Sequence, residues 1–104
     1  MVIGLNSDKV AEYKRLHANV WLGVLKTLSE NHVRNFTIFL KEPENLLFGT
    51  FEYTGDNYDE AEKRIAADPV TQEWWKVTAP CQKPLESRKP GEWWAFMEDV
   101  FHLD

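Results

Sequence analysis

The chain is 104 residues long, 43% hydrophobic and 28% charged, with a net charge of −5 at pH 7. A chain of this size can form one domain with a modest core, so we expect a single domain over residues 1–104. The acidic balance argues against nucleic acid and against an anionic membrane surface as partners, because binding phosphates requires clustered Lys and Arg. A small neutral ligand is the better expectation.

Cysteine usage indicates a reducing compartment. Cys81 is the only cysteine, so an intramolecular disulfide is impossible. The sequence has no charged leader followed by an apolar run, and no stretch approaching the roughly 20 apolar residues of a membrane span. We therefore expect a cytoplasmic protein with no membrane partner.

The chain begins with a predicted strand over Val2–Leu5, and Asn6 to Asp8 then supply the polar residues that start a helix. We expect this helix to run without interruption to about Leu28. A helix turns about 100° per residue, which places most apolar residues of this segment in one stripe. The stripe consists of Val10, Tyr13, Leu16, His17, Val20, Trp21, Val24 and Leu28.

His17 is the best acid/base candidate in the chain. It faces the interior one helical turn from Tyr13, and an imidazole titrates near neutral pH, where small changes in its surroundings set its charge. The alternative is a structural histidine that is hydrogen-bonded within the core and has no chemical role.

Two segments rich in β-branched and aromatic residues, Val33–Leu40 and Leu46–Tyr53, predict a β-hairpin across a polar turn. Gly49 interrupts the second strand, where it indicates either a β-bulge or a close approach by another part of the chain. Of these two interpretations we favour the bulge.

Two helices are predicted next. Asp56 to Ala66 begins with capping and acidic residues, and the pair Asp68-Pro69 then starts a separate helix that ends near Thr78. The second helix carries Trp74 and Trp75 on faces about 100° apart, so one indole can pack in the core while its neighbour lines something else.

Ala79–Glu92 is predicted to be a long irregular loop that acts as a lid, a dimer-wrapping segment or a plain surface connector. Trp93–Leu103 is expected to form the last strand. The resulting order, β-α-β-β-α(α)-β, predicts a ferredoxin-like α+β fold with a four-stranded antiparallel sheet and helices on one face. The other face would be bare and aromatic, so we expect a homodimer, arranged as a dimeric α+β barrel.

The chemistry-bearing residues favour a pocket without a cofactor. His17, His32, His102 and Cys81 lack the short paired spacings of a metal site, and no nucleotide-binding or serine-hydrolase motif is present, so we expect neither metal nor cofactor. The chain has five Trp, six Phe and three Tyr. Aromatic walls with a few polar groups suit a monosaccharide, although each tryptophan taken singly could simply belong to the core.

Five blocks of sequence, in order, resemble the L-rhamnose mutarotase family. They are Tyr13-x-x-x-His17-x-x-x-Trp21, Asn35-Phe-Thr-Ile-Phe-Leu40, Asn45-Leu-Leu-Phe48, Gln72-Glu-Trp-Trp-Lys76 and Glu98-Asp-Val-Phe-His-Leu103. The resemblance covers nearly the whole chain and is weakest between Pro80 and Gly91. It implies a dimeric protein that interconverts the α and β anomers of L-rhamnose without a cofactor.

By position, the resemblance makes His17 the proton donor and Tyr13, Trp74 and Trp75 sugar-contacting residues. Phe36 stands where the family commonly has a substrate-contacting tyrosine, which removes a hydroxyl that the sugar would otherwise contact. A neutral hydrogen bond contributes about 0.5 to 1.5 kcal/mol, so its loss would weaken or redirect sugar binding without abolishing it. L-fucose or another pyranose is therefore also considered as the substrate.

We expect ring opening by proton transfer to the ring oxygen from His17, with Tyr13 either holding the sugar hydroxyls or relaying protons on them. The tryptophans would clamp the sugar ring and exclude water. Two other functions fit the same fold class: a cofactor-free small monooxygenase with an aromatic pocket, and a sugar-binding module without catalysis.

Overall fold

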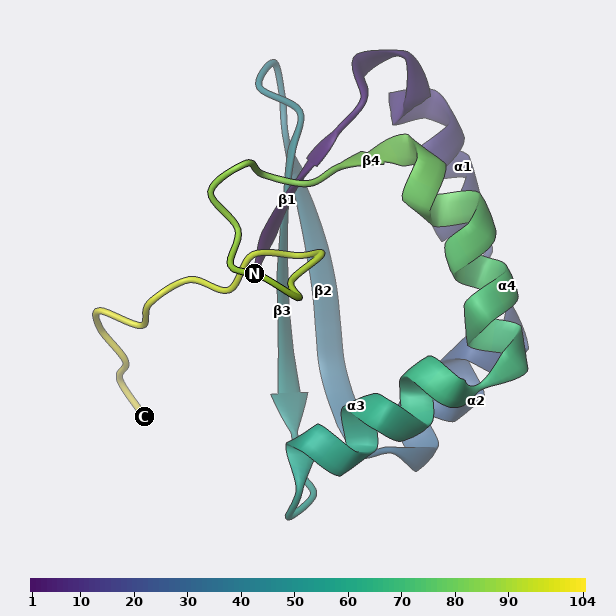
Figure 1. Cartoon of the computed structure of the whole chain (residues 1–104), viewed down its shortest axis with the longest axis vertical. Helices are drawn as coiled ribbons and strands as arrows, with labels where there is room; N and C mark the ends of the chain where they lie inside the picture. Colours follow the sequence, from purple (N-terminus) through teal and green to yellow (C-terminus); the bar gives the residue numbers. More distant parts are fainter.

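The computed structural model describes all 104 residues as a four-stranded antiparallel sheet with helices on one face (Figure 1). The elements are β1 (Val2–Leu5), α1 (Val10–Ala18), α2 (Leu22–Glu30), β2 (Val33–Lys41), β3 (Leu46–Tyr53), α3 (Tyr58–Ala67), α4 (Pro69–Thr78) and β4 (Gln82–Lys83), with 3-10 turns at Ser7–Lys9 and Ala79–Cys81. The sheet order is β2-β3-β1-β4. The predicted ferredoxin-like α+β fold is confirmed.

The predicted single N-terminal helix is wrong, because α1 and α2 are separate helices. Asn19 has φ −141° and ψ 65° and Trp21 has φ −59° and ψ 135°, so neither backbone is helical. Asparagine is common at such positions because its short polar side chain favours helix ends over helix interiors. Asn6 also does not cap a helix; its side-chain amide donates to the carbonyl of Pro80 at 3.2 Å.

The β2–β3 hairpin is confirmed, but the prediction of a bulge at Gly49 is wrong. Gly49 pairs in register with Ile38, and the irregularity lies in β2 between Arg34 and Thr37. A Cβ atom at Gly49 would lie 2.9 Å from the Met1 side chain. The missing side chain therefore makes room for the N-terminus.

Both predicted helix starts in the second half of the chain are confirmed. The side chain of Asn57 accepts a hydrogen bond from the Glu60 amide at 3.2 Å, and α3 begins one residue after Asn57. The Asp68 carboxylate accepts from both the amide (2.9 Å) and the hydroxyl (2.8 Å) of Thr71, and these two bonds hold its pKa below the usual value. Asp68 thus ends α3 and starts α4 in a sharp turn.

The predicted last strand at Trp93–Leu103 is also wrong. Gln82–Lys83, within the expected loop, takes the place beside β1, and Ala95 returns to the same edge of β1 for a single bridge with Val2. The edge of β1 that is not paired with β3 is therefore shared between β4 and Ala95. Beyond Ala95 the chain has no regular structure and extends away from the sheet on the side opposite the helices (Figure 1).

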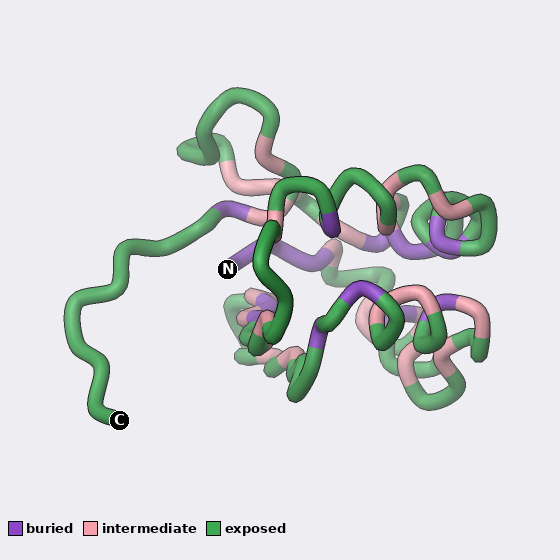
Figure 2. Tube along the Cα trace, turned by 90° about the horizontal axis from the view of Figure 1, so that it is seen from below, coloured by how far each residue is buried: buried purple, intermediate pink, exposed green.

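The buried core joins the sheet to α1 and to the 3-10 turn at Ala79–Cys81, and Figure 2 shows buried residues along strands and helices alike. Its centre consists of Ile3, Leu5, Tyr13, Leu47 and Cys81. Because side chains alternate along a strand, the neighbours of these strand residues face away from the helices. No helix combines the length and the apolar character needed to cross a lipid bilayer.

Candidate functional site

Tyr13 and His17 lie on one face of α1, as their spacing predicts. Their rings stack with centroids 4.1 Å apart and planes at 28°. The Nδ1 atom of His17 is 2.9 Å from the backbone carbonyl oxygen of Tyr13. A carbonyl only accepts hydrogen bonds, so Nδ1 carries the proton and Nε2 is left for another partner.

His17 is half-buried, and its burial lowers the pKa of the imidazole below the ordinary value of 6.5, partly opposed by the hydrogen bond to the Tyr13 carbonyl. Desolvation disfavours the charged form of the ring. At neutral pH His17 is therefore an uncharged imidazole whose Nε2 can accept a proton.

Tyr13 is almost fully buried, with 5% of its surface exposed. Burial raises the pKa of the phenol to about 12, although a hydrogen bond from the Gln82 amide, 3.3 Å away, acts in the opposite direction. The hydroxyl consequently keeps its proton throughout the neutral pH range.

Trp74 brings α4 into the same cluster. Its ring centroid lies 5.3 Å from that of His17 and 5.2 Å from that of Trp21, both in edge-on geometry, and only 6% of its surface is exposed. Trp75 points to a different side of α4, is 45% exposed and makes no ring contact with His17. As expected, one indole of the pair, that of Trp74, is packed in the interior, and the other, that of Trp75, is open to solvent.

Phe36 belongs to a second aromatic cluster. Its ring centroid is 5.6 Å from that of Phe51 in β3, which lies 5.7 Å from the ring of Tyr58 at the start of α3. Phe51 follows Leu47 by four residues on the same strand, so this cluster is on the side of the sheet that the helices cover. The structure therefore joins Tyr13, His17 and Trp74 in one contact group and leaves Phe36 and Trp75 outside it.

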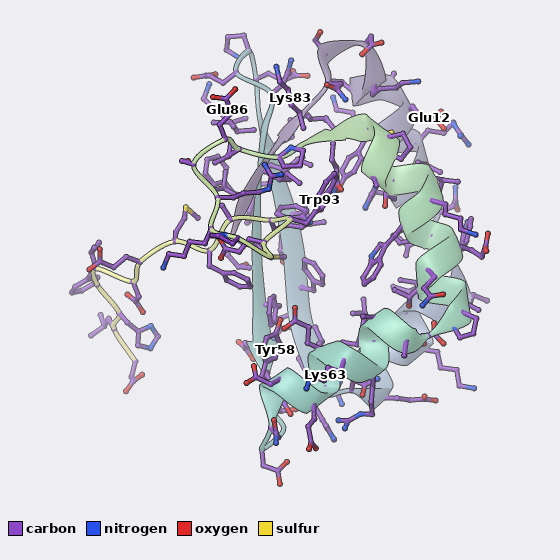
Figure 3. All side chains as sticks on the ribbon, viewed as in Figure 1. Glu12, Tyr58, Lys63, Lys83, Glu86 and Trp93 are labelled. Atoms are coloured by element: carbon purple, nitrogen blue, oxygen red, sulfur yellow. The ribbon has the colours of Figure 1, made fainter.

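Two residues at this site were missed from the sequence. The Nε1 atom of Trp93 donates to Oε1 of Gln82 at 2.7 Å, and Gln82 in turn contacts the Tyr13 hydroxyl. Figure 3 shows Trp93 directed from its loop toward the space between sheet and helices. No sequence pattern could have paired Gln82 with Tyr13, 69 positions earlier, because the contact depends on β4 lying beside β1.

A separate hollow lies elsewhere on the surface. It has a volume of about 540 Å³ and is bordered by the end of β1, the β2–β3 turn and residues 83–86. None of the candidate residues borders it, and its lining is mostly polar. No group of three or more His, Cys, Asp or Glu side chains is placed to hold a metal ion.

Comparison with known proteins shows the family to which the chain is similar. The sequence profile described as L-rhamnose mutarotase matches residues 1–103. A protein of Opitutus terrae named L-rhamnose mutarotase is 34% identical over 104 residues, covering 99% of this chain and 94% of the relative. Another of that name, from Oceanobacillus iheyensis, is 30% identical over 97 residues, covering 93% and 88%.

A solved structure has the same fold. The crystal structure of an L-rhamnose mutarotase from Formosa agariphila matches with a TM-score of 0.71 at 23% sequence identity, over 99% of this chain and 94% of that chain. At this identity the likeness concerns the arrangement of helices and strands.

Proposed function

This chain belongs to the L-rhamnose mutarotase family, and we propose on that premise that residues 1–104 act as a single domain that interconverts the α and β anomers of L-rhamnose. The observation that carries the mechanism is the hydrogen bond between His17 Nδ1 and the Tyr13 carbonyl. It directs a basic Nε2 away from the helix backbone, beside a tyrosine that keeps its proton.

The reaction is the opening and closing of a hemiacetal. In the proposed first step, Nε2 of His17 takes the proton of the anomeric hydroxyl, the carbon-oxygen bond to the ring oxygen breaks, and its electron pair stays on that oxygen. The resulting imidazolium then donates its proton to the ring oxygen. Rotation about the C1–C2 bond and the reverse steps on the other aldehyde face give the second anomer.

One imidazole can serve both oxygens because they are bonded to the same carbon. His17 is then the proton donor to the ring oxygen, as the family resemblance implies, after it has acted as acceptor. Positioned proton transfer of this kind contributes about a hundredfold to ten-thousandfold. The buried Trp74 beside His17 keeps water from the imidazole.

We assign sugar binding to Tyr13, Phe36, Trp74 and Trp75. Partly exposed rings suit the apolar face of a deoxy-sugar, and Phe36 and Trp75 are 40% and 45% exposed. Phe36 offers the sugar a ring without a hydroxyl, so other pyranoses, L-fucose first, are alternative substrates.

The test is anomer exchange measured by NMR saturation transfer with L-rhamnose, L-fucose and a panel of other monosaccharides. We expect acceleration over the uncatalysed exchange, greatest for L-rhamnose. Oxygen-free buffer should change nothing, since proton transfer needs no oxygen. Sugar binding without faster exchange would instead favour a binding module and contradict the proposal.

We further propose that the protein works as a homodimer. The proposal is supported by Phe39, 57% exposed on the sheet face away from the helices, and by an apolar C-terminal segment. The large apolar residues of that segment are Phe96, Met97, Val100, Phe101 and Leu103, each at least 52% exposed. Covering them with a second copy would gain about 25 cal/mol per Å² of apolar surface removed from water.

Size-exclusion chromatography with light scattering, which measures the mass of the eluting protein, tests the dimer. The full chain should have twice the mass of one chain, and replacing Val100 and Phe101 together by Ser should give a monomer. A matched change in the same segment, Glu98→Gln, should leave the dimer intact. A monomeric full chain at micromolar concentration would refute the proposal.

We place the protein in the cytoplasm. The buried, unpaired thiol of Cys81 is suited to a reducing compartment. Cell fractionation of a native host checks this, and recovery outside the cytoplasm would contradict it.

A further inference from the structure

Gln82 connects two side chains that come from distant parts of the chain. Its Oε1 accepts a hydrogen bond from Trp93 Nε1 at 2.7 Å, and its Nε2 donates to the Tyr13 hydroxyl at 3.3 Å. Gln82 is half-buried in β4, where it pairs with Leu5 of β1. The side chain thus forms a bridge between the C-terminal loop and α1.

The indole fixes the orientation of this bridge. An indole N–H can only donate, so the oxygen of the Gln82 amide must face Trp93. The NH2 group must then face Tyr13, whose oxygen accepts this bond and so cannot use its own proton toward Gln82. A reversed amide would place the NH2 group of Gln82 against the indole N–H of Trp93, and neither donor would have an acceptor.

We propose that Gln82, oriented by Trp93, is a positioning residue that directs the Tyr13 hydroxyl proton toward an oxygen of the bound sugar. The inference rests on the proposed function. Tyr13 is then a hydrogen-bond donor and the adjacent His17 Nε2 an acceptor, which matches a sugar that offers an acceptor oxygen next to a hydroxyl.

The loop that carries Trp93 is anchored on β1 at both ends. Gln82 pairs with Leu5 before the loop, and Ala95 exchanges two 2.8 Å hydrogen bonds with Val2 after it. Trp94 packs against the buried core. The backbone on both sides of Trp93 is therefore anchored to the sheet, and the indole that Figure 3 labels bonds to Gln82 in β4.

Gln82→Glu tests the direction of the hydrogen bond. A carboxylate still accepts from Trp93, but it also accepts from Tyr13 and so draws the phenol proton away from the sugar. We expect kcat/KM for L-rhamnose exchange to fall roughly tenfold at pH 8, because the substrate loses one hydrogen bond in the variant. As pH falls and the introduced carboxylate takes up a proton, the ratio of variant to wild-type kcat/KM should return toward one.

Three variants separate positioning from mere structure. Lys83→Gln lowers the net charge by the same one unit on the same strand and should have no effect. In a Tyr13→Phe background Gln82→Glu should cause no further loss, because the group through which it acts is gone. Trp93→Phe, which frees the amide to turn, should raise KM more than it lowers kcat.

The inference is overturned if Gln82→Glu has the same effect with and without the Tyr13 hydroxyl, or if the ratio does not change with pH. It is also overturned if Gln82→Glu retains wild-type kcat/KM at pH 8. If the Gln82→Glu protein does not fold, Gln82→Met is used instead. The loss of kcat/KM caused by Gln82→Met must likewise disappear in the Tyr13→Phe background. Absence of exchange in the wild-type protein would instead refute the proposed function, so the two failures are distinguishable.

Discussion

His17 and Trp74 are 57 positions apart in the sequence, yet their ring centroids lie 5.3 Å apart with the rings edge to face. The contact joins α1 to α4 and removes part of the imidazole from water. Because desolvation disfavours a charged ring, this packing helps to keep His17 in its neutral form at physiological pH, with Nε2 free to accept a proton.

The pH dependence of exchange should reflect the lowered pKa of His17. The imidazole must be neutral to take the sugar proton, so kcat/KM should be constant near neutral pH and fall as pH drops through an apparent pKa below 6.5. The catalysed rate is measured from pH 4.5 to 9 after subtraction of the uncatalysed exchange. An acid limb with a midpoint above 6.5 would contradict the assignment.

Replacing Trp74 by Phe should shift this acid limb upward. The smaller ring exposes the imidazole to more water, which reduces the desolvation that lowers its pKa. Trp75→Phe is the matched control, because it should change KM while leaving the apparent pKa where it is in the wild type. Equal shifts in both variants would mean that the contact with Trp74 does not set the protonation of His17.

Phe36→Tyr should strengthen binding of L-rhamnose. A hydroxyl that reaches the sugar adds one neutral hydrogen bond of about 0.5 to 1.5 kcal/mol, which corresponds to roughly a 2- to 12-fold lower KM. The change should also alter the preference between L-rhamnose and L-fucose. KM values for both sugars are compared in the two proteins, and an unchanged KM would place Phe36 outside the binding site.

Gly4→Ala should damage both stability and activity. A Cβ atom at Gly4 would lie 2.5 Å from the carbonyl oxygen of Lys83, so β4 must move away from β1 and carry Gln82 with it. Forced movement of this kind costs about 1 to 3 kcal/mol. Urea denaturation and exchange kinetics measure the two effects.

Gly49→Ala is the control for this substitution. Its Cβ would meet the flexible end of the Met1 side chain at 2.9 Å, which can move aside. A smaller loss of stability is expected, with activity retained. If Gly49→Ala reduced activity as much as Gly4→Ala, the position of Gln82 would not be the cause.

Local patterns predicted the elements whose signals lie within a few residues. The caps at Asn57 and Asp68 and the hairpin were predictable because each depends on neighbouring residues. The fourth strand could not be predicted, since the two residues Gln82–Lys83 carry no β pattern. They pair because the edge of β1 opposite β3 is open to them. Alternation over Trp93–Leu103 suggested a strand, but Ala95 alone of these residues pairs with the sheet, in a single bridge with Val2.

The candidate site divides in the same way. The pairing of Tyr13 with His17 follows from helical spacing, and the contact is as expected. The break at Asn19 to Trp21 could not be read from the apolar stripe, which continues through it, although this break sets the position of the Trp21 ring against Trp74. The bridge formed by Gln82 depends on three segments that meet only in the folded chain.

The most direct measurement is anomer exchange of L-rhamnose by NMR saturation transfer with the His17→Ala variant. His32→Asn is the control, because His32 has φ 65° and Asn accepts that left-handed conformation. With both variants shown by circular dichroism to be folded, we predict wild-type exchange for His32→Asn and a rate about a hundredfold to ten-thousandfold lower, close to the uncatalysed one, for His17→Ala. A folded His17→Ala protein that exchanges anomers at the wild-type rate would contradict the account.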